Sequence, residues 1–392
     1  MTSSFVRASN AWNSRMGFAV GEHTIFLTLS GSHAHGTSRA ESDVDVRGVC
    51  IAPLRSRLSL FESFEQHEGA LPHDLEPLVR QRLERHPRVS PSSLSEIECA
   101  IFDVAKFISL CAGCNPNALE ILFADERDWI LETPRWRKLH AQRHKFLTRK
   151  VEQTFLGYAM AQLKRIKTHR AWLLSPPKKK PSREDFGLPA ATGTIGREDQ
   201  DRLERAIAEK IRSYGIDDLE LPKPTRLMLR DRIEAFYRDA LRASEDDLDT
   251  RMRAVAGLAS GISPEVMATL EAERRYRAAL RHWEAYETWK SQRNPARAEL
   301  ERKHGYDTKH AMHLIRLLRM GLEILEHGDL RVRRDDADEL IALRAGSLPY
   351  DELLALAEDL KAAMDRASRR ADLPQDIDRG DVDRIAFELI SH

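Results

Sequence analysis

The stretch GSHAHGTSRAESDVDVRG, residues 31–48, decides the fold that we predict for the first part of the chain. Before it, Thr24–Leu29 is rich in residues that favour a pleated strand, and Gly31 follows at a place where that strand can turn. Toward the end of the stretch, two valines alternate with Asp43 and Asp45. Because side chains on a strand alternate between its two faces, both aspartates would lie on one face. The stretch predicts a strand, a turn and a second strand that carries two carboxylates.

Two neighbouring carboxylates indicate a divalent cation, and phosphoryl chemistry at such a cation commonly takes three acids. Asp43 and Asp45 would provide two of them. The third is expected from a neighbouring strand, predicted at Ser95–Ile101, where Glu96 and Glu98 both alternate with other residues that suit a strand. We favour Glu98, and Glu96 remains the alternative.

The small residues between the two predicted strands suit a nucleoside triphosphate. Gly31 would let backbone N–H groups approach phosphate oxygens, Ser32 would add a hydroxyl donor, and Gly36 would relieve crowding where the chain folds back. Thr37 and Ser42 are weaker candidates for phosphate contact. A Gly-Ser turn or an Asp-x-Asp pair alone is common in surface turns. Their order along this chain is more specific, and it indicates a site for a triphosphate and a metal ion.

The composition is that of a globular protein with more than one domain. The chain has 392 residues, of which 42% are hydrophobic and 32% are charged, so it can build cores and gives no general case for disorder. Its length favours two or three domains. We find no long charge-free apolar run and no signal-peptide pattern after Met1, which predicts a cytoplasmic protein without membrane association. A lone C-x-x-C, Cys111 and Cys114, is interpreted as reduced thiols rather than as a zinc or redox site.

Charge is distributed unevenly along the chain, although the formal net charge is zero. From Arg135 to Arg183 the sequence has 15 Lys or Arg residues and a single acid, Glu152. Such a basic segment would attract polyanions and raise the rate of association with them. Its aromatic residues could stack on bases, although aromatic residues at helical spacing more often belong to a core.

The predicted fold class is α+β. Strands and helices would form a first domain in residues 1–125, and a larger, mainly α domain would follow in residues 126–392. We expect residues 57–91 to form a connecting or lid region and Leu330–Arg333 to form a brief strand. A helix is also expected within the first twenty residues. The apolar spacing predicts these further helices: Asp103–Leu110, Trp136–Lys150, Val151–Leu174, Gln200–Tyr214, Arg226–Leu241, Pro264–Lys290, Thr308–His327 and Asp351–Arg370.

One of these helices has a cationic face. If Asp307 or Thr308 caps it, then Lys309, His313 and Arg316 lie on one side. This face could bind the triphosphate or an acceptor phosphate from across a cleft. The alternative is a solvated face on which a histidine is packed and hydrogen-bonded.

Together these motifs resemble the DNA polymerase β nucleotidyltransferase superfamily, and within it the RNA-repair-pathway polymerase β family. Besides the glycine turn and its Asp-x-Asp, the resemblance rests on Asn115-Pro116-Asn117 with Glu120, and on a C-terminal signature in residues 286–320. It covers blocks within residues 24–123 and 283–344, and the second block is expected to face the phosphates.

The resemblance implies that residues 1–125 form a nucleotidyltransferase catalytic domain, with a small mixed sheet and flanking helices. It also implies a site and a reaction. The metal ligands would be Asp43 and Asp45 with a third acid that maps to Glu98, although the superfamily more often has the shorter Asp as its third acid. With Mg²⁺ or Mn²⁺ bound, such an enzyme moves a nucleoside monophosphate from a nucleoside triphosphate (NTP) to an acceptor hydroxyl. The preferred acceptor is an RNA end, of a tRNA or of a repair substrate.

Two other functions remain open from the sequence. The first is a transferase that attaches AMP to a protein hydroxyl, as antitoxin-like members of the superfamily do. The second is a non-catalytic sensor of nucleotide or RNA. The sequence leaves open which NTP is used, ATP or another, whether a template matters, and the oligomeric state.

Overall fold

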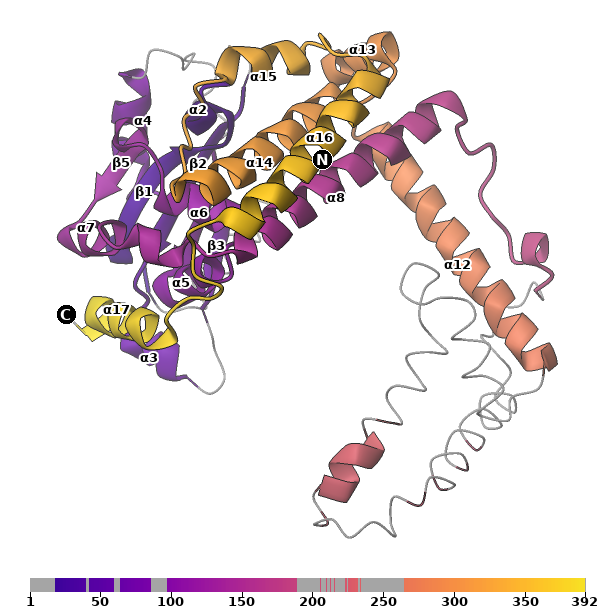
Figure 1. Cartoon of the computed structure of the whole chain (residues 1–392), viewed down its shortest axis with the longest axis horizontal. Coiled ribbons are helices and arrows are strands. Elements are labelled where there is room, and N and C mark those ends of the chain that lie inside the picture. The colour runs from indigo at the N-terminus through magenta and orange to yellow at the C-terminus, as the bar shows by residue number, and fades with distance from the viewer. Residues whose placement is uncertain are drawn as a thin grey trace. The chain divides into compact units, whose positions relative to one another are not determined.

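The computed structural model describes residues 18–39, 42–59, 64–85, 97–188 and 264–391, with scattered positions between 205 and 233. Contacts between Cα atoms divide the chain into two compact units, one formed by Met1–Leu173 with Pro295–His392 and the other by Leu174–Asn294. Figure 1 labels most of the helices and strands. The predicted domain boundary after residue 125 stays a prediction.

A five-stranded mixed sheet lies in the first unit, with the strand order β3-β4-β2-β1-β5. β2 runs parallel to β4, and the other neighbouring pairs are antiparallel. The strands are β1 (Thr24–Ser30), β2 (Val44–Cys50), β3 (Gln66–Ala70), β4 (Ile97–Asp103) and β5 (Trp129–Glu132). With its flanking helices and the mostly helical C-terminal region, this sheet confirms the predicted α+β class.

Burial distinguishes the two central strands. Only Ser30, the last residue of β1, is not buried, as expected for a strand that is paired on both sides and covered on both faces. In β2, Val44 and Val46 are fully buried, whereas Asp45 and Arg47, which alternate with them, are only partly buried. The alternation read from the sequence therefore places the aspartate and the arginine on the more accessible face of β2.

Helices make up most of the rest of the first unit (Figure 1). They are α2 (Gly31–His35), α3 (Leu54–Leu58), α4 (Glu76–Glu84), α5 (Val104–Ala112), α6 (Pro116–Leu122), α7 (Pro134–His140), α8 (Lys150–Leu174), α13 (Pro295–His304), α14 (Thr308–His327), α15 (Ala337–Arg344), α16 (Tyr350–Arg370) and α17 (Arg379–Ser391). Several of them pack into one core cluster, in which Trp136 stacks on Phe26 of β1 with ring centroids 3.7 Å apart.

The helix α14 is central to the packing of the C-terminal region. Its bounds, Thr308–His327, confirm the predicted helix, and Asp307 caps it by accepting a hydrogen bond from a backbone N–H of the first turn. A Cβ built at Gly321 would lie 2.7 Å from Met364 of α16 and 2.9 Å from Phe155 of α8. These short distances show that α14 packs closely against both helices, which run beside it in Figure 1. A residue larger than glycine at position 321 would therefore force its neighbours to shift.

The prediction of a connecting region over residues 57–91 is wrong where the chain forms β3 and α4. β3 pairs with β4 at the edge of the sheet, and α4 buries Val79 and Leu83 against it. The prolines that suggested irregular chain are compatible with this helix, since Pro72 precedes it and Pro77 lies in its first turn, where no N–H partner is lost.

Two further predictions are wrong because tertiary contacts override local pattern. Trp136–Lys150 is not one helix: α7 ends at His140, a short 3-10 helix covers Arg143–Phe146, and Arg149 N–H donates to the Pro374 carbonyl at 2.9 Å. Leu330–Arg333 is not a strand. The chain there is fixed by side chains instead, notably by the bidentate pair between Arg333 and Asp128.

Some predictions lie wholly or largely outside the described residues. These are the helix within the first twenty residues, the helices Gln200–Tyr214 and Arg226–Leu241, and the alternative third acid Glu96.

The second unit is described mainly by α12 (Pro264–Ser291) and a 3-10 helix, η5 (Glu184–Phe186). Arg183 forms an ion pair with Glu273 of α12 at 2.9 Å, and the rings of Phe186 and Tyr276 meet edge to face. In the part of the chain that the structure describes, no helix combines the length and the hydropathy needed to cross a bilayer.

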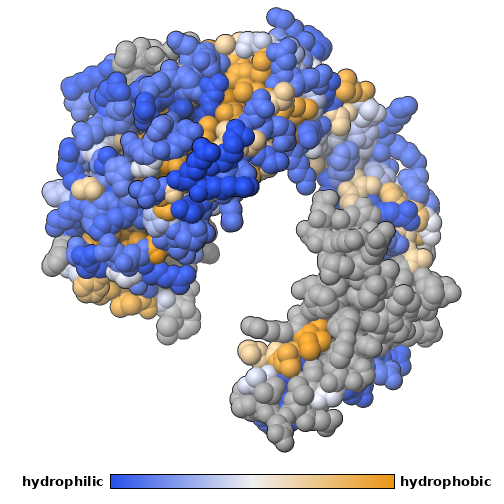
Figure 2. Space-filling view, viewed as in Figure 1, coloured by the Kyte–Doolittle hydropathy of each residue, from blue (hydrophilic) through white to orange (hydrophobic). Residues whose placement is uncertain are grey.

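The surface of the first unit is mostly hydrophilic in the view of Figure 2, and its lower edge carries a hydrophobic patch. The large exposed apolar residues Leu54 and Leu58 of α3 and Phe387 of α17 belong to the helices at that edge.

The four cysteines are buried free thiols, and burial raises the pKa of Cys99 to about 12.

Candidate active site

The register of the sheet brings two of the predicted acids together. β2 and β4 pair in parallel with Asp45 opposite Glu98, and Ser30 of β1 is opposite Asp45 on the other side. Neighbouring strands lie about 4.8 Å apart, and residues opposite each other project to the same face. The Asp45 and Glu98 side chains therefore share one face of the sheet, and Asp43 immediately precedes β2 and is exposed.

A cavity of about 850 Å³ opens over this face. Asp45 and Glu98 line it from the sheet, Gly31 lines it from the start of α2, and His313 and Arg316 line it from α14. The cavity thus joins Asp45 of the N-terminal motif to two residues of the cationic face predicted near the C-terminus, whereas Asp43 and Lys309 are not among its lining residues. The motif and this face both belong to the first unit, although more than 200 residues separate them in the sequence.

Gly31 is close to one of the acids. It begins α2 with φ of +60°, and a Cβ built on it would lie 2.3 Å from Oδ2 of Asp45. The predicted Gly-Ser turn is therefore the start of the short helix α2, which packs against the carboxylate. Ser32 is partly buried at the start of this turn, and Gly36 ends it in the left-handed conformation with φ of +78°.

Ser42 stabilises the loop that leads into β2. Its hydroxyl oxygen accepts a hydrogen bond from the backbone N–H of Arg39 at 2.8 Å, and the side chain is buried. In this conformation Ser42 shapes the loop before Asp43.

Arg47 is a site residue that the sequence reasoning missed. Its Nη2 lies 3.4 Å from Oδ1 of Asp45, and its Nη1 donates to the Val46 carbonyl at 3.1 Å and to the Glu98 carbonyl at 3.4 Å. The period-two alternation that places Asp45 on the accessible face also places Arg47 there, and this was the signal available in the sequence.

Lys309 and His313 approach the acids from α14. Burial and the charges of two arginines lower the pKa of Lys309, whereas Asp43 and Asp45 raise it, so the ammonium group lies within electrostatic range of both aspartates. His313 lines the cavity, and burial and the Arg316 charge hold its pKa well below 6.5. The imidazole of His313 is therefore neutral near pH 7.

A buried cluster of three side chains, His35, Glu120 and Arg316, lies at the wall of the same cavity. Nε2 of His35 is 3.0 Å from Glu120 and 2.9 Å from Arg316, and Arg316 also donates to Glu120. Burial would raise the pKa of Glu120, but Arg316 and His35 lower it well below its usual value. Burial and Arg316 lower the pKa of His35. Glu120 is thus held as a carboxylate by a guanidinium from α14.

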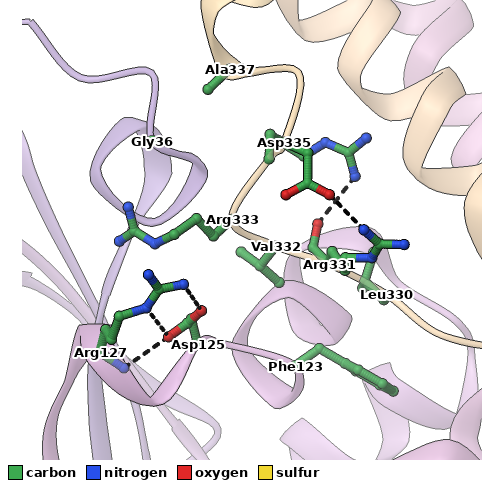
Figure 3. Close-up of a pocket in the computed structure, with 11 residues that line it drawn as sticks. Gly36, Phe123, Asp125, Arg127, Leu330, Arg331, Val332, Arg333, Asp335 and Ala337 are labelled. Carbon is green, nitrogen blue, oxygen red and sulfur yellow. Dashed lines mark hydrogen bonds and ion pairs between the residues drawn. The ribbon is translucent and has the colours of Figure 1, made fainter.

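A second cavity, of about 440 Å³, lies on the other side of the α2 turn, where Gly36 lines it (Figure 3). Several arginines surround it, but they are paired with acids: Arg127 binds Asp125 at 2.8 Å, and Arg331 binds Asp335 at 2.5 Å. The backbone N–H of Arg334 donates to the His35 carbonyl at 3.2 Å. These contacts fix the segment after α14 to the turn that precedes the acids.

The aromatic residues of the basic segment divide between core and surface. Phe155 and Trp172 are buried, as the core interpretation predicts. Tyr158 is 37% exposed, and its hydroxyl accepts a hydrogen bond from Asn115 at 2.8 Å. Of these three rings, only Tyr158 is available for a stacking contact.

Comparison with known proteins gives one match. The model of the RNA repair pathway DNA polymerase beta family matches residues 9–174, a range that includes the acids, the α2 turn and the whole sheet. No curated protein and no solved structure matches the chain. The family description indicates a polymerase β-type nucleotidyltransferase of RNA repair. Over residues 9–174 the chain matches the RNA repair pathway DNA polymerase beta family, which confirms the family suspected from the N-terminal motifs, while the C-terminal signature lies outside the matched range.

Proposed function

We propose that this protein is a metal-dependent nucleotidyltransferase that moves a nucleoside monophosphate from an NTP to an acceptor hydroxyl. The observation that supports this most strongly is the parallel register of β2 and β4, which sets Asp45 beside Glu98 on the floor of a large cavity. An Asp-x-Asp at the start of one strand, with Asp43 just before β2 and Asp45 within it, and a third acid on the neighbouring strand suit this chemistry.

The chemistry of the donors fits Mg²⁺ or Mn²⁺. Asp43, Asp45 and Glu98 offer only oxygen ligands, two of them are exposed and the third is partly buried, so a cation could bind with several waters. The Arg47 guanidinium lies 3.4 Å from the Asp45 carboxylate, so a positive charge is already stabilised beside this acid. When bound, the metal would supply charge stabilisation for the triphosphate and for the attacking oxygen.

The remaining side chains would bind and orient the triphosphate. Lys309 brings positive charge from α14, and the neutral His313 can donate or accept a hydrogen bond in the cavity. Among the residues of the α2 turn, Gly31 and Ser32 would contact phosphate, while Gly36 and Ser42 would fix the loops on either side. Glu98 would complete the metal site or accept the proton of the attacking hydroxyl.

An RNA end is the acceptor that we favour. The family description names RNA repair, and the basic segment of residues 135–183 supplies charge that would attract a polyanion. A protein hydroxyl is the alternative acceptor, and a sensor that binds nucleotide without transfer is the alternative function.

The test supplies each NTP, labelled at the α-phosphate, with Mg²⁺ or Mn²⁺ and either cellular RNA or cellular protein. We expect label in RNA, with loss of at least about 100-fold in rate for Glu98→Gln, as expected for a group that acts in the transition state. Glu68→Gln is the matched control, because Glu68 also lines the cavity and is exposed.

The outcomes separate the candidates. Label in protein alone would replace RNA by a protein acceptor. Binding of NTP without transfer to either pool would support the sensor and reject the proposal, and equal rates for Glu98→Gln and Glu68→Gln would reject Glu98 as a site residue.

A further inference from the structure

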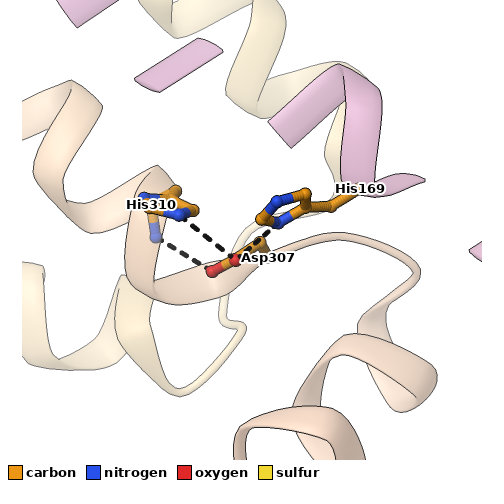
Figure 4. A group of neighbouring side chains, drawn as sticks. All are labelled: His169, Asp307 and His310. Carbon is orange, nitrogen blue, oxygen red and sulfur yellow. Dashed lines mark hydrogen bonds and ion pairs between the residues drawn. The ribbon is translucent and has the colours of Figure 1, made fainter. Parts of the chain in front are cut away.

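A cluster of possible metal ligands lies where α8 meets the start of α14. His169 of α8 and Asp307 and His310 of α14 each offer one ligand atom, and these atoms lie within 4.8 Å of one another. Figure 4 shows both imidazoles directed toward the Asp307 carboxylate. This group shares no residue with the acids of the active site.

The spacing of the ligand atoms suits a tetrahedral first-row transition metal. Nδ1 of His169 is 3.1 Å, and Nε2 of His310 is 3.6 Å, from the same oxygen, Oδ2 of Asp307. With metal–ligand bonds near 2 Å, ligands of a tetrahedral ion lie about 3.3 Å apart. Imidazole nitrogen with one carboxylate is a donor set that Zn²⁺, Co²⁺ and related ions prefer over Mg²⁺.

Hydrogen bonds from neighbouring groups orient the His310 and Asp307 side chains, as such bonds do for the ligands of known metal sites. The side-chain oxygen of Gln162 lies 2.7 Å from Nδ1 of His310, so this nitrogen donates and the lone pair of Nε2 is directed at Asp307. The other oxygen of Asp307 is fixed by its cap to the backbone N–H of His310 at 3.1 Å. Asp307 is fully buried, and the side chains of His169 and His310 are 15% and 14% exposed.

Arg297 is the competing cation at this place. It donates to Oδ2 of Asp307, and its Nε also lies 3.5 Å from the buried Glu301. If a metal binds Asp307, Arg297 keeps a carboxylate partner in Glu301. With neutral imidazoles, Asp307, Glu301 and Arg297 carry a net charge of minus one, which favours the approach of a cation.

We propose that His169, Asp307 and His310 bind one first-row transition ion of the zinc class, with water completing the coordination. The ion would tie α8 to the first turn of α14, next to Lys309. This inference does not rest on the proposed function. For His169, binding requires only that its proton sits on Nε2, so that Nδ1 faces the ion.

The test measures zinc binding to the full, untagged chain after dialysis against a chelator. We expect one Zn²⁺ per chain, and affinity at least about 100-fold weaker in His169→Ala and in His310→Ala, since each removes a ligand. Gln162→Leu should weaken binding about 10-fold and Gln162→Glu should restore it, because Gln162 only orients His310. His73→Ala is the matched control, because the His73 side chain is 90% exposed and should have no effect.

Two additional measurements keep the outcome clear. Co²⁺ added to the wild-type chain should give the visible absorption of a tetrahedral nitrogen-ligated ion, which needs no variant to fold. The double variant Asp43→Asn/Asp45→Asn should keep its zinc, which separates this site from the active-site acids. Absence of stoichiometric Zn²⁺ from the wild type, or equal affinity in the two ligand variants and in His73→Ala, would overturn the proposal.

Discussion

Two groups of carboxylates line one cavity, and they differ in how they are neutralised. Glu120 is buried and contacts Arg316 and His35, so its charge is compensated within the protein. Glu98 is exposed, and in the part of the chain that the structure describes its carboxylate has no ion-pair partner. Asp45 has a single guanidinium at 3.4 Å.

The difference indicates which acids can accept a cation from solution. A carboxylate bound by a buried guanidinium gains little from a metal when displacing that guanidinium would leave it without a second carboxylate partner. A carboxylate that faces an open cavity beside a second carboxylate gains most, because the cation relieves their repulsion. We therefore assign Glu120 a structural role and Asp43, Asp45 and Glu98 the proposed ligand role.

The largest expected effect is on activity. Asp43→Asn with Asp45→Asn should lower nucleotide transfer at least about 1000-fold, since the several kcal/mol that a bound metal supplies are lost. The free energy of unfolding in urea should stay within about 0.5 kcal/mol of wild type, because neither side chain is buried. A variant that retains transfer would break the assignment, and one that unfolds would show that these acids have a structural role.

The reverse pattern is expected for the buried acid. Glu120→Ala should lower the free energy of unfolding by about 3 to 5 kcal/mol, because it leaves the Arg316 guanidinium buried without its carboxylate. Glu98→Ala is the matched comparison, with an expected change of about 0.5 kcal/mol or less. Urea titrations of both variants measure the contrast, and similar losses in the two would remove the distinction between the groups.

A smaller effect should appear at Gly31, which touches Asp45. Gly31→Ala adds a Cβ at a left-handed φ and 2.3 Å from Oδ2 of Asp45, whereas Gly328→Ala adds one at a similar φ with its nearest neighbour 3.8 Å away. Both should lose about 1 to 2 kcal/mol of stability from backbone strain. Only Gly31→Ala should raise the Mg²⁺ concentration needed for half-maximal transfer, because Asp45 must move. Equal metal requirements would mean that this contact does not position Asp45.

The smallest effect concerns pH and the buried cluster. The pKa of His35 is lowered in the folded protein, so below about pH 6.5 the unfolded chain takes up a proton that the folded chain does not. Stability should therefore fall on acidification, by about 1 kcal/mol between pH 6.5 and 5.5 for this one group. Urea unfolding of wild type and His35→Gln at these two pH values should show a smaller drop in the variant. The same drop in both would mean that His35 does not carry this linkage.

Local patterns in the sequence were enough to predict the parts of the fold that depend on them. The valine and aspartate alternation predicts the β2 face, and the apolar spacing with a capping Asp307 predicts α14. The pairing of Asp45 with Glu98 follows from the strand order, which only the structure supplies.

Contacts between distant residues could not be predicted. Glu120 and Arg316 are 196 positions apart, and nothing in either neighbourhood indicates that they meet. The same is true of the Arg333 pair with Asp128, which replaces the strand expected at Leu330–Arg333. Pro72 and Pro77 suggested irregular chain, but they lie before α4 and in its first turn. Proline disrupts a helix only after the first turn, so these two prolines are compatible with a helix that starts here.

The most direct test of the central claim follows both halves of one NTP. The chain is supplied with NTP labelled at the α-phosphate in one reaction and at the γ-phosphate in another, with Mg²⁺ and RNA. We predict one pyrophosphate released for each nucleoside monophosphate attached, and neither product when Mg²⁺ is withheld. Tight NTP binding without pyrophosphate release, with Mg²⁺ or Mn²⁺ present, would contradict the proposal that Asp43, Asp45 and Glu98 form a nucleotidyltransferase site.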